Sequence, residues 1–110
     1  ETANKEILSP LLMECGLSHL MEKPDTEADW SHILSLGEQQ KLAFVRVFLR
    51  KPKWVFLDEA TSAMDEETEE KMYRLLTALP GTTVISIGHR STLDKWHDRV
   101  FRITNGKLIG

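Results

Sequence analysis

The chain has 110 residues, which is one domain at most, and its 41% hydrophobic and 28% charged content is typical of a globular protein. A net charge of −3 gives no electrostatic reason to expect binding to nucleic acid or to an anionic membrane. The single cysteine, Cys15, excludes an internal disulfide and suits a reducing compartment. No apolar run approaches the roughly 20 residues that a membrane span needs.

The N-terminal part of the sequence predicts helices. Residues 1–17 carry one helical stripe of apolar side chains: Ile7, Leu8, Leu11, Leu12 and Cys15. Gly16 suits a C-terminal stop, whereas Pro10 interrupts the pattern. The helix therefore either kinks at Pro10 or is a shorter one that starts there. A second helical piece is expected over residues 18–23, followed by an acidic loop at 25–29.

A stronger helix is predicted to begin at Ser35. Ser35 and Glu38 have the S-x-x-E form of a capping box, and Pro52 ends the segment. The residues between them are apolar nearly all round: Leu42, Ala43, Phe44, Val45, Val47, Phe48 and Leu49. This pattern predicts a helix buried within the domain.

The next element is the one around which the chain is organised. Residues 54–57 form an apolar run without polar alternation, which predicts a strand buried on both faces of a parallel sheet. The run ends in Asp58 and Glu59, and small, turn-forming residues follow at 60–63. In open parallel sheets, ligands bind beyond the carboxyl ends of the strands, where these acids would lie.

The C-terminal part predicts a parallel crossover and a hairpin. Asp65 is a good N-cap for a helix that ends at Pro80-Gly81 and whose buried face carries Thr68, Met72, Leu75, Leu76 and Leu79. Residues 83–87 form the next strand, parallel to the first. A short helix at 91–97 and a strand at 99–103 follow. Asn105-Gly106 then predicts a hairpin turn with residues 107–109 pairing back.

Three stretches resemble motifs of the ATP-binding-cassette (ABC) ATPases, in that family's order and spacing. LSLGEQQKLAFVRVFLRKP (34–52) is similar to the signature motif and its helix, LDEATSAMD (57–65) to the Walker B strand and D-loop, and SIGHR (86–90) to the switch-histidine loop. The resemblance implies an α/β fold: part of a P-loop NTPase fold, with a parallel sheet core, flanking helices and a C-terminal β-hairpin. It assigns residues 1–34 to the helical subdomain and residues 35–110 to the C-terminal part of the ATPase core.

The strand-end residues suit ATP hydrolysis. Asp58 is suited to hold Mg²⁺ through its waters, since magnesium keeps much of its hydration shell. Glu59 is suited to orient or deprotonate the attacking water. The resemblance assigns these same roles to both residues, makes His89 the contact to the γ-phosphate, and places Asp65 in the D-loop beside the nucleotide. A histidine is more often structural, but its position in this motif favours the catalytic role.

The signature segment departs from the family's usual LSGGQ form. A helix N-terminus offers free N–H groups to a phosphate, Ser35 adds a hydroxyl, and Gly37 allows close backbone approach. Leu36 in place of Gly reduces that approach, and Glu38 in place of Gln adds negative charge, part of which the capping box would absorb. The LSLGEQQ variant resembles a branch that includes peroxisomal fatty-acyl transporters and bacterial relatives linked to peptide or vitamin B12 uptake.

The sequence contains no G-x-x-x-x-G-K-[ST] phosphate loop. With its start at Glu1, it therefore resembles the C-terminal half of a nucleotide-binding domain, a piece that we expect to be inactive alone. In the family two domains sandwich two ATP molecules, so Ser35 and Gly37 would act on nucleotide held by the other domain.

The expected function is ATP hydrolysis that energises transport across a membrane. The expected partners are a second nucleotide-binding domain, identical or different, and the transmembrane domain of the same transporter, with no nucleic acid. The segment would lie on the cytoplasmic face. Two alternatives stay open: a soluble ABC ATPase of DNA maintenance or translation, and a fragment that serves only as an interaction module. A metal hydrolase using His89, Asp94, His97 and Asp98 is possible by composition, although zinc-type spacing is absent.

Overall fold

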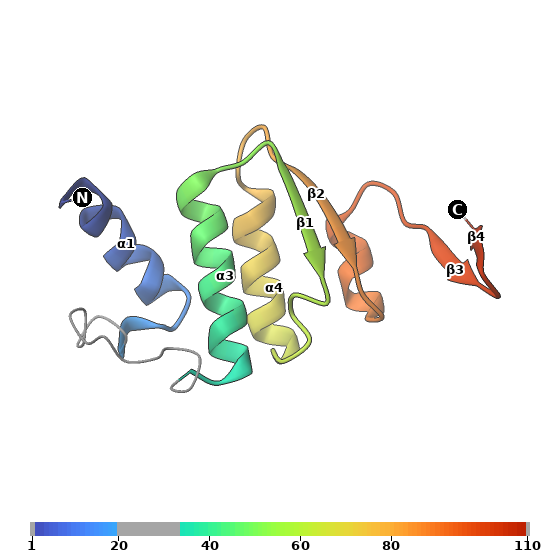
Figure 1. The fold of residues 1–110 in the computed structure, drawn as a ribbon, viewed down its shortest axis with the longest axis horizontal. Coiled ribbons are helices and arrows are strands. Elements are labelled where there is room, and N and C mark those ends of the chain that lie inside the picture. The colour runs from blue at the N-terminus through green and yellow to red at the C-terminus, as the bar shows by residue number, and fades with distance from the viewer. Residues whose placement is uncertain (1, 20–33, 110) are drawn as a thin grey trace.

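The computed structural model describes residues 2–19 and 34–109. In chain order the elements are α1 (Thr2–Glu14), α3 (Leu36–Arg50), β1 (Trp54–Asp58), α4 (Glu66–Thr77), β2 (Thr83–Ile87), the 3₁₀ helix η2 (Ser91–Trp96), β3 (Arg102–Thr104) and β4 (Lys107–Ile109). In space the molecule extends from α1 at one end to the β3–β4 hairpin at the other, with α4 lying between α3 and β1 (Figure 1). Most of the predicted helix at 18–23 and the whole acidic loop at 25–29 lie outside the described residues.

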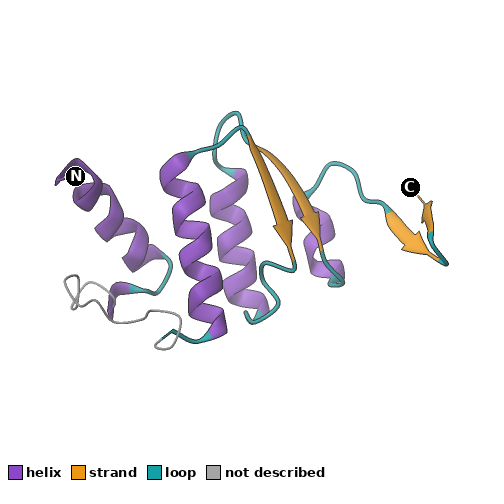
Figure 2. Ribbon diagram, viewed as in Figure 1, coloured by secondary structure: helices purple, strands orange, loops and turns teal. Residues whose placement is uncertain are grey.

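The two long strands form a parallel pair, as predicted. Their register runs from Trp54 opposite Thr83 to Asp58 opposite Ile87. Helices α3 and α4 lie side by side on one side of this pair (Figure 2). The sheet with its flanking helices confirms the α/β arrangement.

The prediction that β1 is buried on both faces is wrong for this chain. Val55 and Leu57 are buried, but Trp54 and Phe56 are 59% and 73% exposed. Alternate strand residues point to opposite faces, and the helices cover only the face that carries Val55 and Leu57. The apolar side chains of Trp54 and Phe56 therefore lie on a face of the sheet that the described helices leave open.

The core lies between the sheet and the helices, with α1 packed against α3. Its buried members come from every helix and both halves of the chain: Leu12, Cys15, Leu17, Phe44, Val45, Phe48, Val55, Leu57, Met64, Met72, Tyr73, Leu76 and Leu93. Burial raises the pKa of the Cys15 thiol to about 11. The thiol therefore stays protonated and is a packing group rather than a nucleophile.

The predicted helix ends are largely confirmed. Ser35 and Glu38 form the reciprocal capping box of α3, and Lys51 ends that helix in the left-handed conformation. Gly16 follows α1 with φ +74°. Pro10 lies inside α1, so the alternative of a shorter helix starting there is wrong. Its side chain is exposed, so the proline removes one backbone hydrogen bond without disturbing the core.

The C-terminal elements match the prediction in type and order, but their boundaries differ. α4 ends at Thr77, before the predicted stop at Pro80-Gly81, and η2 ends at Trp96 rather than at residue 97. The short helix is present as η2, and β3 and β4 pair antiparallel around Asn105 and Gly106, which both have positive φ. β3 starts at Arg102 rather than at the predicted residue 99. It is only as long as its three-residue partner β4.

Both outer edges of the β1–β2 pair lack a neighbouring strand within the described residues. A groove of about 920 Å³ runs along β2 and is closed on its other side by residues 93–101. No helix in residues 2–19 or 34–109 is long and apolar enough to cross a bilayer.

Candidate active site

Two predicted catalytic side chains meet where the parallel strands end. Glu59 directly follows β1 and takes a left-handed backbone conformation with φ 54°, while its N–H donates to the carbonyl of Ile87 at 2.8 Å. His89 lies two residues beyond β2. Its Nε2 is 3.2 Å from Oε1 of Glu59, and the two side chains are 94% and 40% exposed. Both groups can therefore reach a ligand at this edge of the sheet.

Asp58 is the last residue of β1 and directly precedes Glu59 in the chain. Its side chain is exposed and makes no hydrogen bond or ion pair with the residues that the structure describes. Those residues contain no cluster of three side chains able to enclose a metal ion. A single open carboxylate fits Mg²⁺, which is commonly held by one or two carboxylates, its own waters and substrate phosphates.

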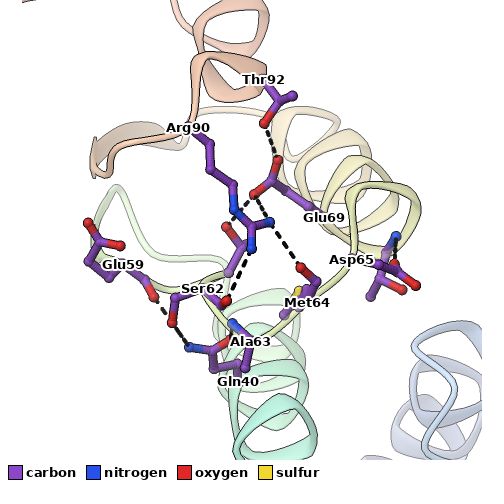
Figure 3. A network of polar contacts seen from close by, with 11 residues as sticks. Gln40, Glu59, Ser62, Ala63, Met64, Asp65, Glu69, Arg90 and Thr92 are labelled. Carbon is purple, nitrogen blue, oxygen red and sulfur yellow. Dashed lines mark hydrogen bonds and ion pairs between the residues drawn. The ribbon is translucent and has the colours of Figure 1, made fainter.

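The loop 60–65 joins Glu59 to α4, and the side chain of Gln40 on α3 holds it from one side. Nε2 of Gln40 donates to the carbonyl of Glu59 at 3.3 Å and to Oγ of Ser62 at 3.0 Å. Its Oε1 accepts from the N–H of Ala63 at 2.9 Å. The carboxylate of Glu59 points away from these contacts (Figure 3). The signature helix and the strand-end loop therefore form one connected unit.

Arg90 and Glu69 hold the same loop from the opposite side, although the sequence patterns did not predict a role for either residue (Figure 3). Arg90 contacts the loop carbonyls, and the buried Glu69 of α4 binds Arg90 at 3.0 Å. The helical period contains a signal for Glu69, because it stands three, four and seven residues before the buried Met72, Tyr73 and Leu76.

The capping box uses much of the hydrogen-bonding capacity of the signature segment. Oγ of Ser35 accepts from the N–H of Glu38 at 3.1 Å, and Oε1 of Glu38 accepts from the N–H of Ser35 at 3.0 Å. His19 contributes a second partner for Glu38 at 2.7 Å. The N–H of Ser35, and then His19, lower the pKa of Glu38. The hydroxyl hydrogen of Ser35 stays free to donate, so the predicted contact to a phosphate is compatible with the cap.

Leu36 and Gly37 face different surroundings. Leu36 is 60% exposed at the start of α3, so its side chain does not contribute to the core. A Cβ added to Gly37 would lie 3.1 Å from the carbonyl oxygen of Ala63. The absence of a side chain at Gly37 therefore lets α3 approach the loop 60–65 closely.

We predict that Gly37→Ala destabilises the fold by about 1–2 kcal/mol, because the added methyl group overpacks the contact with the Ala63 carbonyl. Urea unfolding measures the change. Leu36→Ala is the neighbouring control and should cost less than about 0.5 kcal/mol. Equal stability of Gly37→Ala and the parent chain would show that the space beside the Ala63 carbonyl accommodates a methyl group without strain.

The predicted cofactor-binding residue Asp65 is the N-cap of α4. Its Oδ1 accepts from the N–H of Thr68 at 2.8 Å, and hydrogen bonds from Thr68 lower the pKa of the Asp65 carboxyl group. The carboxylate therefore stabilises the helix start and marks the end of the loop 60–65. The described contacts give it no further role.

The alternative metal site is wrong. His97 directs Nδ1 to the carbonyl of Leu93 and Nε2 to Oγ of Ser86, each at 2.7 Å. Asp94 pairs with Arg102 at 3.1 Å. Among the described residues, His89, Asp94, His97 and Asp98 form no metal-ligating group.

The strand-end carboxylates, the adjacent histidine and the capped helix agree with the class of ATP-binding proteins whose motifs the sequence resembles. A family model described as ABC transporter matches residues 2–62, more than half of the chain. The chain belongs to the ABC transporter family.

Three relatives support this assignment. An uncharacterized ABC transporter ATP-binding protein of Haemophilus influenzae is 56% identical over 81% of this chain. The chloroplastic ABC transporter D family member 2 of Arabidopsis thaliana is 50% identical over 94%, and the lysosomal cobalamin transporter ABCD4 of Homo sapiens is 42% identical over 96%. The chain spans only 15%, 15% and 18% of these three proteins, in that order.

Proposed function

We propose that this chain is the part of an ABC transporter ATPase that carries its hydrolytic residues, and that the intact protein uses ATP hydrolysis to move a solute across a membrane. The observation that carries the proposal is the meeting of Glu59 and His89, 3.2 Å apart, directly after the exposed carboxylate of Asp58 at the end of β1. Three polar groups at the carboxyl ends of parallel strands suit a substrate that brings phosphates and a metal ion.

Each residue then has a distinct task in hydrolysis. Asp58 holds the waters of Mg²⁺, which when bound neutralises charge on the phosphates. Glu59 accepts a hydrogen bond from the attacking water and takes its proton. His89 approaches the γ-phosphate from its position beside the carboxylate of Glu59. The exposure of both side chains supports this assignment, because substrate must reach them from solvent.

The N-terminus of α3 serves the nucleotide of a second nucleotide-binding domain. Ser35 keeps a hydroxyl hydrogen to donate, and the first N–H groups of the helix favour an anion. Because Glu38 is tied to Ser35 and His19, its charge opposes phosphate binding less than a free carboxylate would. Leu36, exposed beside these groups, would contact the partner domain.

We propose that the other partner is the transmembrane domain of the same transporter and that this segment lies on the cytoplasmic face. The transporter relatives support this assignment, and no feature favours nucleic acid as a partner. Cobalamin, the solute named for one relative, and fatty-acyl compounds are the solutes to test first.

The proposal is tested by Mg²⁺-dependent ATP hydrolysis in the full-length protein that contains this chain, reconstituted in lipid vesicles. Hydrolysis stimulated by a transported solute is expected. A full-length protein that binds ATP but never hydrolyses it, with any solute, would overturn the proposal.

For the same protein we predict that Asp58→Asn weakens the binding of Mg²⁺ about 10-fold or more and lowers nucleotide affinity, because the amide removes the charge that faces the metal. The Mg²⁺ concentration at half-maximal hydrolysis is the measurement. Asp98→Asn removes the same charge from an exposed position two residues beyond the end of η2 and should leave this concentration unchanged. Equal values for both variants would remove Asp58 from the metal site.

A further inference from the structure

A carboxylate that the hydrolysis scheme does not use is buried behind the active site. The side chain of Glu69 on α4 is 1% exposed, and both of its carboxylate oxygens accept hydrogen bonds. Its Oε2 accepts from Oγ1 of Thr61 at 2.7 Å and from Nη1 of Arg90 at 3.0 Å, and its Oε1 accepts from Oγ1 of Thr92 at 2.6 Å. An unpaired buried charge is very costly, so these three donors are what makes the position tolerable.

The partners of Glu69 come from the two segments that carry the catalytic pair. Thr61 lies two residues after Glu59, and Arg90 and Thr92 lie one and three residues after His89. The carboxylate of Glu69 therefore anchors two segments to α4. One directly follows Glu59 and the other directly follows His89.

Arg90 makes the connection direct. Its Nη1 donates to the carbonyl of Met64 at 2.9 Å, and its Nη2 donates to the carbonyl of Ser62 at 3.1 Å (Figure 3). The planar guanidinium presents several donors in a fixed fork, so one side chain reaches both carbonyls and Glu69 together. The residue next to His89 is thus fastened to the loop that follows Glu59.

We infer that Arg90 and Glu69 are positioning residues that set the approach of His89 to Glu59 for ATP hydrolysis, an inference that rests on the function proposed above. The direct contact between His89 and Glu59 is exposed and screened by solvent, so it adds little to holding these two side chains in place. Glu69 is buried, and the hydrogen bond from Arg90 to the carbonyl of Met64 is partly buried, so these contacts are screened less and hold both segments. Gln40 completes the arrangement by holding the same loop from α3.

The test uses the full-length protein with three variants. Arg90→Lys keeps the charge but loses the fork, because an ammonium group is a single point donor. We expect kcat to fall about 10- to 100-fold with KM for ATP changed less than about 2-fold, since a displacement of about 1 Å in a catalytic group has effects of that size.

Glu69→Gln keeps the shape of the side chain and loses its charge. Its kcat should fall about 3- to 10-fold, because charge-assisted hydrogen bonds are roughly twice as strong as neutral ones.

Glu70→Gln is the matched control. Glu70 is the next residue on α4 and pairs with Lys95 at the surface, so its kcat should equal that of the parent. Parent-like kcat in folded Arg90→Lys, or a loss of ATP affinity that accounts for the whole effect, would overturn the inference. If Arg90→Lys does not fold, the test rests on Glu69→Gln, and a parent-like kcat for that variant would overturn the inference.

Amide hydrogen exchange gives a readout that does not depend on activity. The N–H groups of Ser62, Ala63 and Met64 are all hydrogen-bonded: they donate to the carbonyl of Glu59, to Oε1 of Gln40 and to the carbonyl of Thr61, in that order. In Arg90→Lys these amides should exchange faster, while those in the middle of α3 should not. Unchanged exchange in the loop would contradict the inference. If the parent protein itself fails to hydrolyse ATP, the proposed function falls, and the exchange result alone decides whether Arg90 holds the loop.

Discussion

Glu59→Gln in the full-length protein is expected to lower ATP turnover about 10²- to 10⁴-fold while leaving ATP binding in place. The amide keeps the shape of the side chain and can still hydrogen-bond to water and to His89, but it cannot take a proton from water. The measurement pairs a steady-state hydrolysis assay with equilibrium binding of a fluorescent ATP analogue. A split between turnover and binding identifies a group that acts in the chemical step.

The control for this variant is Glu66→Gln. Glu66 is an exposed acid in the first turn of α4, so its substitution makes the same chemical change away from the strand ends. It should retain turnover close to that of the parent. If Glu59→Gln also hydrolysed ATP near the parent rate, the base would have to be another group and the role assigned to Glu59 would be wrong.

The features that the sequence predicted correctly are those determined by local chemistry. The capping box of Ser35 and Glu38, the N-cap at Asp65 and the turn at Asn105-Gly106 each depend on residues within four positions of one another. Such interactions form with the same partners whatever packs around them. The meeting of Glu59 and His89 was also predictable in outline, because parallel strands bring their carboxyl ends to one edge.

The features that were missed depend on neighbours distant in sequence. An apolar run such as 54–57 shows that a strand can be buried on both faces, but only the surrounding chain decides whether it is. Trp54 and Phe56 are exposed because the helices cover one face alone. The link between Arg90 and the loop 60–65 spans more than 25 positions, and neither its donors nor its backbone acceptors form a sequence pattern.

The same exposed sheet leads to the second large expected effect. β1 and β2 pair only with each other among the described residues, so each leaves a row of N–H and C=O groups open on its outer side. Parallel strands are normally interior, and open edges pair readily with other chains. Residues 83–87 are strongly β-prone and carry no charge or proline that would oppose such pairing.

We therefore predict that the 110-residue chain, studied alone, self-associates through the β2 edge. Sedimentation velocity from about 5 to 200 μM should show dimers and larger species that increase with concentration. Ile85→Lys places a charge in the middle of β2, on the partly exposed side, and should shift the chain toward monomer. Met13→Lys, which removes an exposed apolar side chain from α1, is the control and should leave association unchanged.

Hydrogen exchange distinguishes association from a closed monomer. In an associating chain, protection of the amides of Val84 and Ser86 should rise with protein concentration, because these N–H groups point away from β1 and their hydrogen bonds come from another copy. The amides of α4 should be protected to the same degree at every concentration. A chain that sediments as a monomer throughout, with Val84 and Ser86 strongly protected, would mean that it satisfies the β2 edge by itself, and the open edge would not persist in solution.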